Sequence, residues 1–470
     1  MKANTFTIPK IGIISLIGLS ALCSVKINAQ SLESAVAHAL DSHPDIRQSF
    51  ARFKSKEEDV NRASAGYLPT IDLTAGYGYE YTDTPGNRKS AIGTNGDGTT
   101  NLTPGEFGIS LRQIIFDGMF TSNEIDRTMY EASAEKWTLI ASAEDLALNV
   151  SKAYLNYLKA EQAITLTERN VTSHQEIYEQ IKERTDSGLG SVADLSQVTG
   201  RLARAQSNLI AARNNLLDAQ TQFVRLTNAL PKDLVMPVPD ADMLPKNRHT
   251  GLNFAIENHP IIKSAQQDTR AALSYKKTVK ANYYPELALE LSANSYNDVD
   301  GESGINRFGA DVGGHRNEAS AMLRLRYNFF AGGKDVALER SAAYKVSEAR
   351  EINYSAHRQV TESYELAWNA YEMLGLQKQY IKQHIITSNE TQLAYKDQFS
   401  LGKRNLLDLL DTKNELFQAR KDYLDADFNE LSARYRLLNV TGQLLNSLRV
   451  TRSEAWQGEH NYDEQGANDE

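Results

Sequence analysis

The chain has 470 residues, a formal net charge of −9 at pH 7 and one cysteine. Its acidic balance makes it a poor candidate for binding nucleic acid, whose phosphates attract basic surfaces. The mean hydropathy is −0.48, and no run after residue 29 approaches the roughly 20 apolar residues of a membrane-spanning helix, so the chain is either a soluble exported protein or one that enters a membrane by β-strands.

Residues 1–29 have the features of a secretory signal peptide. Two lysines precede an apolar run over 11–25, which is too short for a membrane-spanning helix. We expect cleavage after Ala29, which would remove the only cysteine and take the net charge from −9 to −12. The mature chain could then form no disulfide and no thiolate metal site. Lipid attachment at Cys23 is the alternative, but Leu22 stands where a lipobox has a small residue.

An internal repeat organises most of the chain. A shift of 216 residues aligns Ser42-His43-Pro44 with Asn258-His259-Pro260, and a shift of 214 aligns Asp194-Leu195 with Asp408-Leu409. The predicted segments are, in order, a first structural repeat (30–230), a Pro-rich crossover (231–251), a second structural repeat (252–446) and a polar, acidic tail (447–470) that we expect to be disordered.

Long helices dominate both repeats. Apolar residues recur at spacings of three and four along 146–181, 195–226 and 409–440, which is typical of coiled coils. Gly188 and Gly402 break these patterns and predict turns. The expected order in each repeat is a helix, a β-hairpin (near 70–116 and 286–330), a long helix (120–187 and 334–401) and a second helix (191–229 and 405–446). At 1.5 Å per residue the long helices would reach roughly 100 Å, too long for a globular core.

One acidic residue interrupts the last of these apolar seams. Glu430 stands where an apolar residue is expected, so we expect the seam of the last helix to be less dry there or shifted in register.

Each hairpin alternates with a period of two. Along 71–81, apolar and tyrosine residues alternate with small or charged ones, as in a transmembrane β-strand. A soluble sandwich strand would alternate in the same way, so only the four strands together favour a barrel wall around water. The charged residues that we expect to face its lumen are Asp72, Glu80, Arg112, Glu290, Arg324 and Arg326.

Four strands cannot close a barrel by themselves, because transmembrane barrels have at least about eight strands and lipid does not tolerate an open sheet edge. The chain must therefore oligomerise. Two copies would give a barrel largely filled by side chains, whereas three copies would leave more room for a pore. The strand count alone allows either.

A combination of motifs resembles the TolC family over roughly 31–446. It comprises the duplication, the two His-Pro pairs, the Leu68-Pro69 entry to the first strand, and above all Phe399-Ser400-Leu401-Gly402-Lys403-Arg404 followed by Asp408-Leu409-Leu410-Asp411. The stretch Ala65-Gly66-Tyr67-Leu68-Pro69-Thr70 further resembles the branch that serves type I secretion of large adhesins.

The resemblance implies a mixed α and β fold, the TolC-like channel-tunnel. In this fold a homotrimer forms a 12-stranded transmembrane β-barrel in the outer membrane, and a long α-helical coiled-coil barrel continues it into the periplasm. It implies a passive duct with no cofactor and no catalysed reaction. The expected partners are outer-membrane lipid, a periplasmic adaptor and an inner-membrane ABC transporter, or alternatively an RND pump.

The resemblance also carries over a periplasmic gate. Asp408 and Asp411 would line the constriction, where a trimer places six carboxylates that attract cations, and Arg404 would tether the closed state. Phe399 stands where the best-known member has a tyrosine, so a hydroxyl tether is missing. Ala193 replaces a threonine beside Asp194, the remaining predicted gate residue. Without the family, the helix dipole is the better explanation of acids in a helix's first turn.

Other function classes are weaker. The nine histidines form no ligand pair and no phosphate loop is present, so the sequence favours neither an enzyme nor a structural metal site. We expect a duct for protein cargo, with a duct for multidrug efflux as the alternative. A periplasmic coiled-coil scaffold or adhesin without a pore is the alternative of another class.

Overall fold

The computed structural model describes residues 30–85, 99–299, 314–460 and 462. The predicted signal peptide and the middle of each hairpin connection lie outside these ranges. Along the described ranges, no helix combines the length and the apolar character that crossing a membrane would need.

Each repeat opens with two helices rather than the single helix that the sequence predicted. The break falls at the His-Pro pairs, because the residue before a proline is driven out of the helical region. His43 and His259 are extended, with ψ of 131° and 128°, and the Nδ1 atom of each accepts a hydrogen bond from the backbone N–H two residues on, both at 3.2 Å. The four helices are α1 (Leu32–Ser42), α2 (Pro44–Ser64), α6 (Arg248–Asn258) and α7 (Pro260–Lys280).

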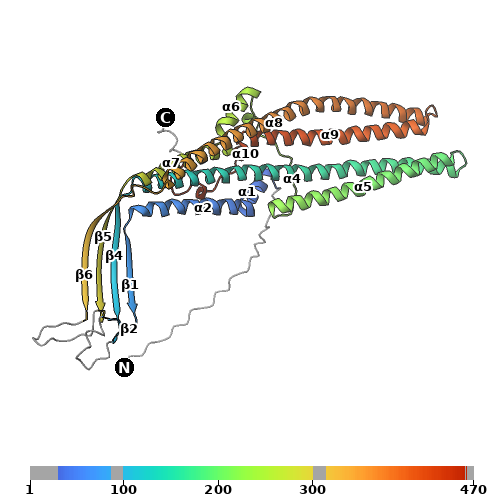
Figure 1. The fold of residues 1–470 in the computed structure, drawn as a ribbon. Helices are drawn as coiled ribbons and strands as arrows, with labels where there is room; N and C mark the ends of the chain where they lie inside the picture. Colours follow the sequence, from blue (N-terminus) through green and yellow to red (C-terminus); the bar gives the residue numbers. More distant parts are fainter. Residues whose placement is uncertain (1–29, 86–98, 300–313, 461, 463–470) are drawn as a thin grey trace, which may run out of the picture.

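Four antiparallel strands form one sheet at one end of the helices (Figure 1). Its order is β1-β4-β5-β6, so the pairing of β4 with β5 joins the two repeats, while β1 and β6 are the edges. The strands are β1 (Thr70–Tyr77), β4 (Gly105–Phe116), β5 (Glu286–Asn297) and β6 (Arg316–Arg326).

Two details of the predicted hairpins were wrong. The expected continuous strand over 71–81 stops at Tyr77, because the N–H of Gly78 turns to the carbonyl of Pro104 at 2.9 Å. The chain then enters a separate two-stranded ladder of β2 (Glu80–Asp83) and β3 (Thr99–Leu102). At the other end, β6 stops at Arg326, so Tyr327 and Phe329 lie beyond the sheet.

Two very long helical hairpins extend away from the sheet (Figure 1). The helix α4 contacts both α5 and α9, and α9 contacts α8, which gives one layer in the order α5-α4-α9-α8. The longest two, α4 and α8, have 67 residues each. The bounds are α4 (Phe120–Asp186), α5 (Val192–Thr227), α8 (Lys334–Ser400) and α9 (Leu406–Val440).

The apolar seams expected from the sequence are buried between these helices. On α5 the buried seam residues are Val198, Leu202, Ala205, Ala212, Ala219, Phe223 and Leu226. On α9, the side chain of Glu430 is buried in the seam although it is charged. Lys378 of α8 lies 2.8 Å from its Oε2 atom and Arg434 lies 2.5 Å from its Oε1 atom, so two cations compensate the buried carboxylate.

The main apolar core lies where α1 and α2 pack on α4. Tyr154 is fully buried there. Its hydroxyl oxygen lies 2.7 and 2.6 Å from the carbonyl oxygens of Gln30 and Val235, to which its one proton can be donated, and it accepts a hydrogen bond from the Val235 N–H at 2.9 Å. These contacts attach the start of α1 and the crossover to the same face of α4.

The predicted disorder of the tail was wrong for the part that the structure describes. After the short helix α10 (Leu444–Ser447) the chain continues through a 3-10 turn (Glu454–Trp456) and returns to α2. Tyr462 is 3% exposed, packs edge-on against Phe53 at 5.9 Å between ring centroids, and its hydroxyl donates to Glu57 at 3.2 Å. Burial of this ring, together with the packing of Val450 and Trp456 on the same core, holds an otherwise polar segment in place.

Candidate constriction at the helical turns

The two helical hairpins end in turns of the same construction. Gly188 and Gly402 have φ of 74° and 69°, a left-handed conformation that favours glycine. The next N–H groups, of Leu189 and Lys403, return to carbonyls of the preceding helix, each at 2.9 Å. Both predicted turn glycines therefore end their helices by the same motif, as the internal repeat requires.

Asp408 lies in the first turn of α9. Its N–H donates to Oδ1 of the capping residue Asn405 at 2.8 Å, and its carboxylate lies 3.3 Å from the guanidinium of Arg404. Arg404 also stacks on Tyr395, 4.1 Å from the ring centroid, and donates to Oε1 of Gln398 at 3.1 Å. The structure thus brings Arg404 and Asp408 together, with Arg404 held by its own hairpin.

Asp411 is paired with a residue that sequence reasoning missed. Arg201 of α5 lies 2.8 Å from Oδ1 of Asp411, so this ion pair connects the first repeat to the second. No pattern within α5 points to this partner, because Asp411 lies 210 residues further along the chain.

Phe399 belongs to an apolar cluster just above the turns. It packs against buried residues of three helices, and the guanidinium of Arg184 lies 6.0 Å from its ring centroid. The absent hydroxyl is therefore replaced by an apolar contact rather than by another hydrogen bond. The buried members of this turn cluster are Ile177, Ile181, Val198, Leu406 and Leu410.

Asp194 stands apart from these contacts. It is half-buried in the first turn of α5, where Ser191 caps the helix, and it forms no ion pair within the described part of the chain. The structure of one chain does not bring Asp194 to Arg404.

Five of the six charged residues assigned to a barrel lumen share one face of the sheet. Residues that lie opposite each other in neighbouring strands point to the same face of the sheet. Asp72 lies opposite Ser110, and Ser110 lies opposite Ser292. Arg326 lies opposite Glu286 on that same face. On this face Arg112 and Arg324 approach Glu290 at 3.8 and 2.6 Å, and Arg112 also pairs with Glu286. The sixth, Glu80, lies in β2 and so outside this sheet.

The other face of the sheet is apolar, because side chains alternate along each strand. It carries Ile71, Leu73, Phe107, Ile109, Leu323 and Leu325. A β-bulge between Ile114 and Phe116 places Phe116 opposite Leu287 on this same face. Side chains of this kind, exposed in a single chain, need an apolar environment.

The described residues hold no group of three metal-ligating side chains. What the turns offer is charge: paired carboxylates and arginines at the ends of long, rigid helices. Such an arrangement can attract or exclude ions and can open or close, but it assembles no nucleophile with a base.

Comparisons with known proteins match both repeats and the fold. The family model described as outer membrane efflux protein matches residues 35–229 and 251–443, one match in each repeat. The outer membrane protein TolC of Escherichia coli is 24% identical over 439 residues, covering 92% of this chain and 85% of that protein. The alkaline protease secretion protein AprF of Pseudomonas aeruginosa is 20% identical over 417 residues, covering 86% of this chain and 83% of that protein. The solved structure of the CmeC outer membrane channel of Campylobacter jejuni superimposes with a TM-score of 0.76 at 15% identity, covering 94% of each chain.

Proposed function

Because this chain belongs to the outer membrane efflux protein family and is an outer-membrane channel for efflux or secretion, we propose that three copies close into one duct for protein cargo. The observation that supports closure most directly is that, among the residues that the structure describes, the sheet and the helical layer each have two edges without a neighbour. The first edge consists of β1 and α5, and the second edge consists of β6 and α8. Each edge can pack against another copy of the chain.

The sheet edges pair between copies in this proposal. An open edge exposes unpaired backbone groups, which hydrocarbon does not tolerate. Pairing β6 of each copy with β1 of the next removes every edge and gives twelve strands from three copies, since each chain contributes the four strands of one sheet. The apolar face then meets lipid, and Asp72, Arg112, Glu290, Arg324 and Arg326 face the lumen.

The helical edges carry matching apolar rows. On α8, Leu366, Met373 and Tyr380 are spaced by seven and are 51%, 55% and 79% exposed in the single chain. On α5, Ile210 and Leu217 are spaced by seven and are 69% and 60% exposed. A spacing of seven is the coiled-coil repeat, so α8 of one copy can pack against α5 of the next.

The closed trimer gathers the turns around one axis. Asp408 and Asp411 then form a ring of six carboxylates that concentrates cations, and the Arg201–Asp411 pair between the two hairpins holds the closed arrangement. Within one chain Arg404 contacts only its own hairpin, so its proposed tether would act between copies. Asp194 would meet a neighbouring copy there, which is consistent with its lack of an ion pair within the described part of one chain.

The turn tips are the proposed docking surface for the rest of a tripartite system. Leu189, Val192 and Leu401 are 81%, 73% and 69% exposed, and exposed apolar side chains at the tip of a polar hairpin favour contact with another protein. We assign this contact to a periplasmic adaptor that works with an inner-membrane ABC transporter. The secretion named for AprF, together with the Ala65–Thr70 motif, supports protein cargo.

Photo-crosslinking in cells tests the partner and the cargo class together. A photoreactive amino acid at Leu189 or Leu401 should capture one adaptor, and that adaptor should copurify with an ABC transporter. The matched control is Tyr344, which is 77% exposed on α8 but distant from the turns. Capture of an adaptor that copurifies with an RND pump would replace protein secretion by drug efflux, and equal capture from Tyr344 would contradict docking at the turns.

A further inference from the structure

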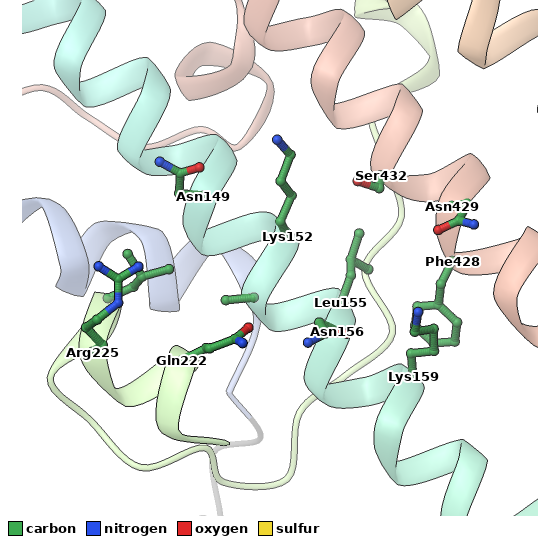
Figure 2. A pocket seen from close by; sticks show the side chains of 12 residues that line it. Asn149, Lys152, Leu155, Asn156, Lys159, Gln222, Arg225, Phe428, Asn429 and Ser432 are labelled. Atoms are coloured by element: carbon green, nitrogen blue, oxygen red, sulfur yellow. The ribbon is translucent and has the colours of Figure 1, made fainter. Parts of the chain in front are cut away.

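A cavity of about 460 Å³ opens between α4, α5 and α9, well away from the turns and the sheet. Figure 2 shows it lined from α4 by Lys152 and Lys159, from α5 by Gln222 and Arg225, and from α9 by Phe428. The volume lies within the range of roughly 300–1,000 Å³ that small-molecule sites occupy.

The cavity is basic in an acidic chain. Three of its twelve lining residues are cationic and none is acidic. Lys159 is paired with Asp425 at 3.3 Å, whereas Lys152 and Arg225 have no carboxylate within ion-pair distance in the described part of the chain. Both side chains are exposed at the mouth of the cavity. Partial desolvation by the surrounding helices and the nearby charge of Arg436 lower the pKa of Lys152, and Asp145 opposes them only in part. An anion entering the cavity would relieve this excess of positive charge.

Amides and apolar groups complete the lining. Asn149, Asn156, Gln222 and Asn429 supply neutral hydrogen-bond donors, and Leu155, Leu226 and Phe428 supply apolar surface. Cations and amides suit a carboxylate or sulfonate, while the apolar side chains suit an organic body attached to it.

The cavity lies on the uncovered face of the helical layer. Successive residues of an α-helix are rotated by about 100°, so Lys152 and Asn156 project from the side of α4 opposite Tyr154. Tyr154 holds the crossover and the start of α1, so those elements cover the other side. If the layer closes into a duct with these coverings outside, the cavity faces the conduit; this placement rests on the proposed function.

We propose that this cavity is a binding site for small amphipathic organic anions, which carry a carboxylate or sulfonate on an apolar body. In the trimer it occurs three times at one level of the conduit wall. There it would hold anionic solutes that the acidic ring at the turns disfavours.

Isothermal titration of the purified full-length protein in detergent with 1-naphthalenesulfonate tests the proposal, with empty micelles as the blank. We expect saturable binding of one molecule per chain and markedly weaker binding of methanesulfonate, which lacks the apolar body. The double variant Lys152→Met/Arg225→Met should bind at least about tenfold more weakly, since two charge-assisted contacts are lost. The matched variant Lys232→Met/Lys246→Met makes the same charge change on the exposed crossover and should bind as wild type does.

If the double variant does not assemble, the single variant Lys152→Gln should still weaken binding. Absence of saturable binding to wild type, or equal affinity in both double variants, would overturn the site. Equal affinity for methanesulfonate would overturn the amphipathic ligand class. The titration measures binding by the isolated protein. Its result therefore does not depend on the cargo or the partners of the proposed duct.

Discussion

Glu144 is a buried carboxylate at the junction between α4 and the C-terminal segment. It is 2% exposed, accepts a hydrogen bond from the N–H of Leu445 at 3.3 Å, and lies 4.0 Å from Arg452. Burial raises the pKa of Glu144 to about 7, although the Leu445 N–H and Arg452 both oppose the shift. The protonated form of Glu144 is therefore favoured in the folded protein.

This shift predicts a pH dependence of stability. The folded chain holds the Glu144 proton up to about pH 7, whereas the unfolded chain releases it near 4.5. The free energy of unfolding should therefore decrease as the pH rises through this window, by on the order of 3 kcal/mol for a shift of this size. Glu144→Gln should melt at a higher temperature than wild type at pH 8, with little difference at pH 4.5. Melting curves of the two proteins that run parallel across this range would contradict the shifted pKa.

The pair of Arg201 with Asp411 should matter for gating more than for stability. Half-exposed ion pairs contribute only about 0–1 kcal/mol, so Arg201→Ala should melt within a few degrees of wild type. Because the pair joins the two hairpins, we expect its loss to raise the closed-state conductance in planar bilayers. Arg213→Ala removes a pair with Glu168 inside the first hairpin and is the control. A conductance in Arg201→Ala equal to that of the control would exclude a role in closure.

At the scale of elements, the periodicity of the sequence predicted the features that depend on neighbouring residues, namely the long helices and the two faces of the sheet. The four long helices begin and end within a few residues of the expected positions, except at the end of α9, because glycine turns and capping residues mark the helix ends in the sequence. Both faces of the sheet followed from alternation. The break after Tyr77 was missed, since Gly78 and Tyr79 continue the alternating pattern while the backbone leaves the ladder. The Arg201–Asp411 pair was missed because nothing in local sequence brings α5 to α9.

The C-terminal segment was the largest error for the same reason. Its composition is polar, but Tyr462 finds a buried site on Phe53 and Glu57, about 400 residues earlier in the chain. The composition of a segment does not reveal that one of its residues packs into a buried site formed by distant residues.

The structure predicts a graded response at Tyr462. Removing a buried aromatic side chain costs about 3–5 kcal/mol, so Tyr462→Ala should lower the melting temperature clearly. Tyr462→Phe loses only the hydrogen bond to Glu57 and should cost about 1 kcal/mol. Limited proteolysis should cleave the alanine variant between Arg449 and Trp456 faster than the phenylalanine variant. An alanine variant that melts and is cleaved like wild type would show that the segment does not stabilise the protein.

At the scale of the whole molecule, duplication explains the architecture. Each repeat supplies two strands of the sheet and one helical hairpin. The pairing of β4 with β5 and the contact of α4 with α9 join the repeats into one open sheet and one open helical layer. Both layers have edges on the same two sides, so one rotation can close both at once. The match to the outer membrane efflux protein family in both repeats favours a channel over a pore-less scaffold.

The conductance of the purified protein in planar bilayers tests the central claim, an export duct constricted by Asp408 and Asp411, most directly. Wild type should form a cation-selective pore that divalent or trivalent cations block from the periplasmic side, because six carboxylates attract them. Asp408→Ala/Asp411→Ala should lose both the selectivity and the block. Glu176→Ala/Glu179→Ala, which removes two exposed acids of α4, should keep both. Unchanged selectivity and block in the Asp408→Ala/Asp411→Ala variant would contradict the ring, and a wild type without conductance would contradict the duct itself.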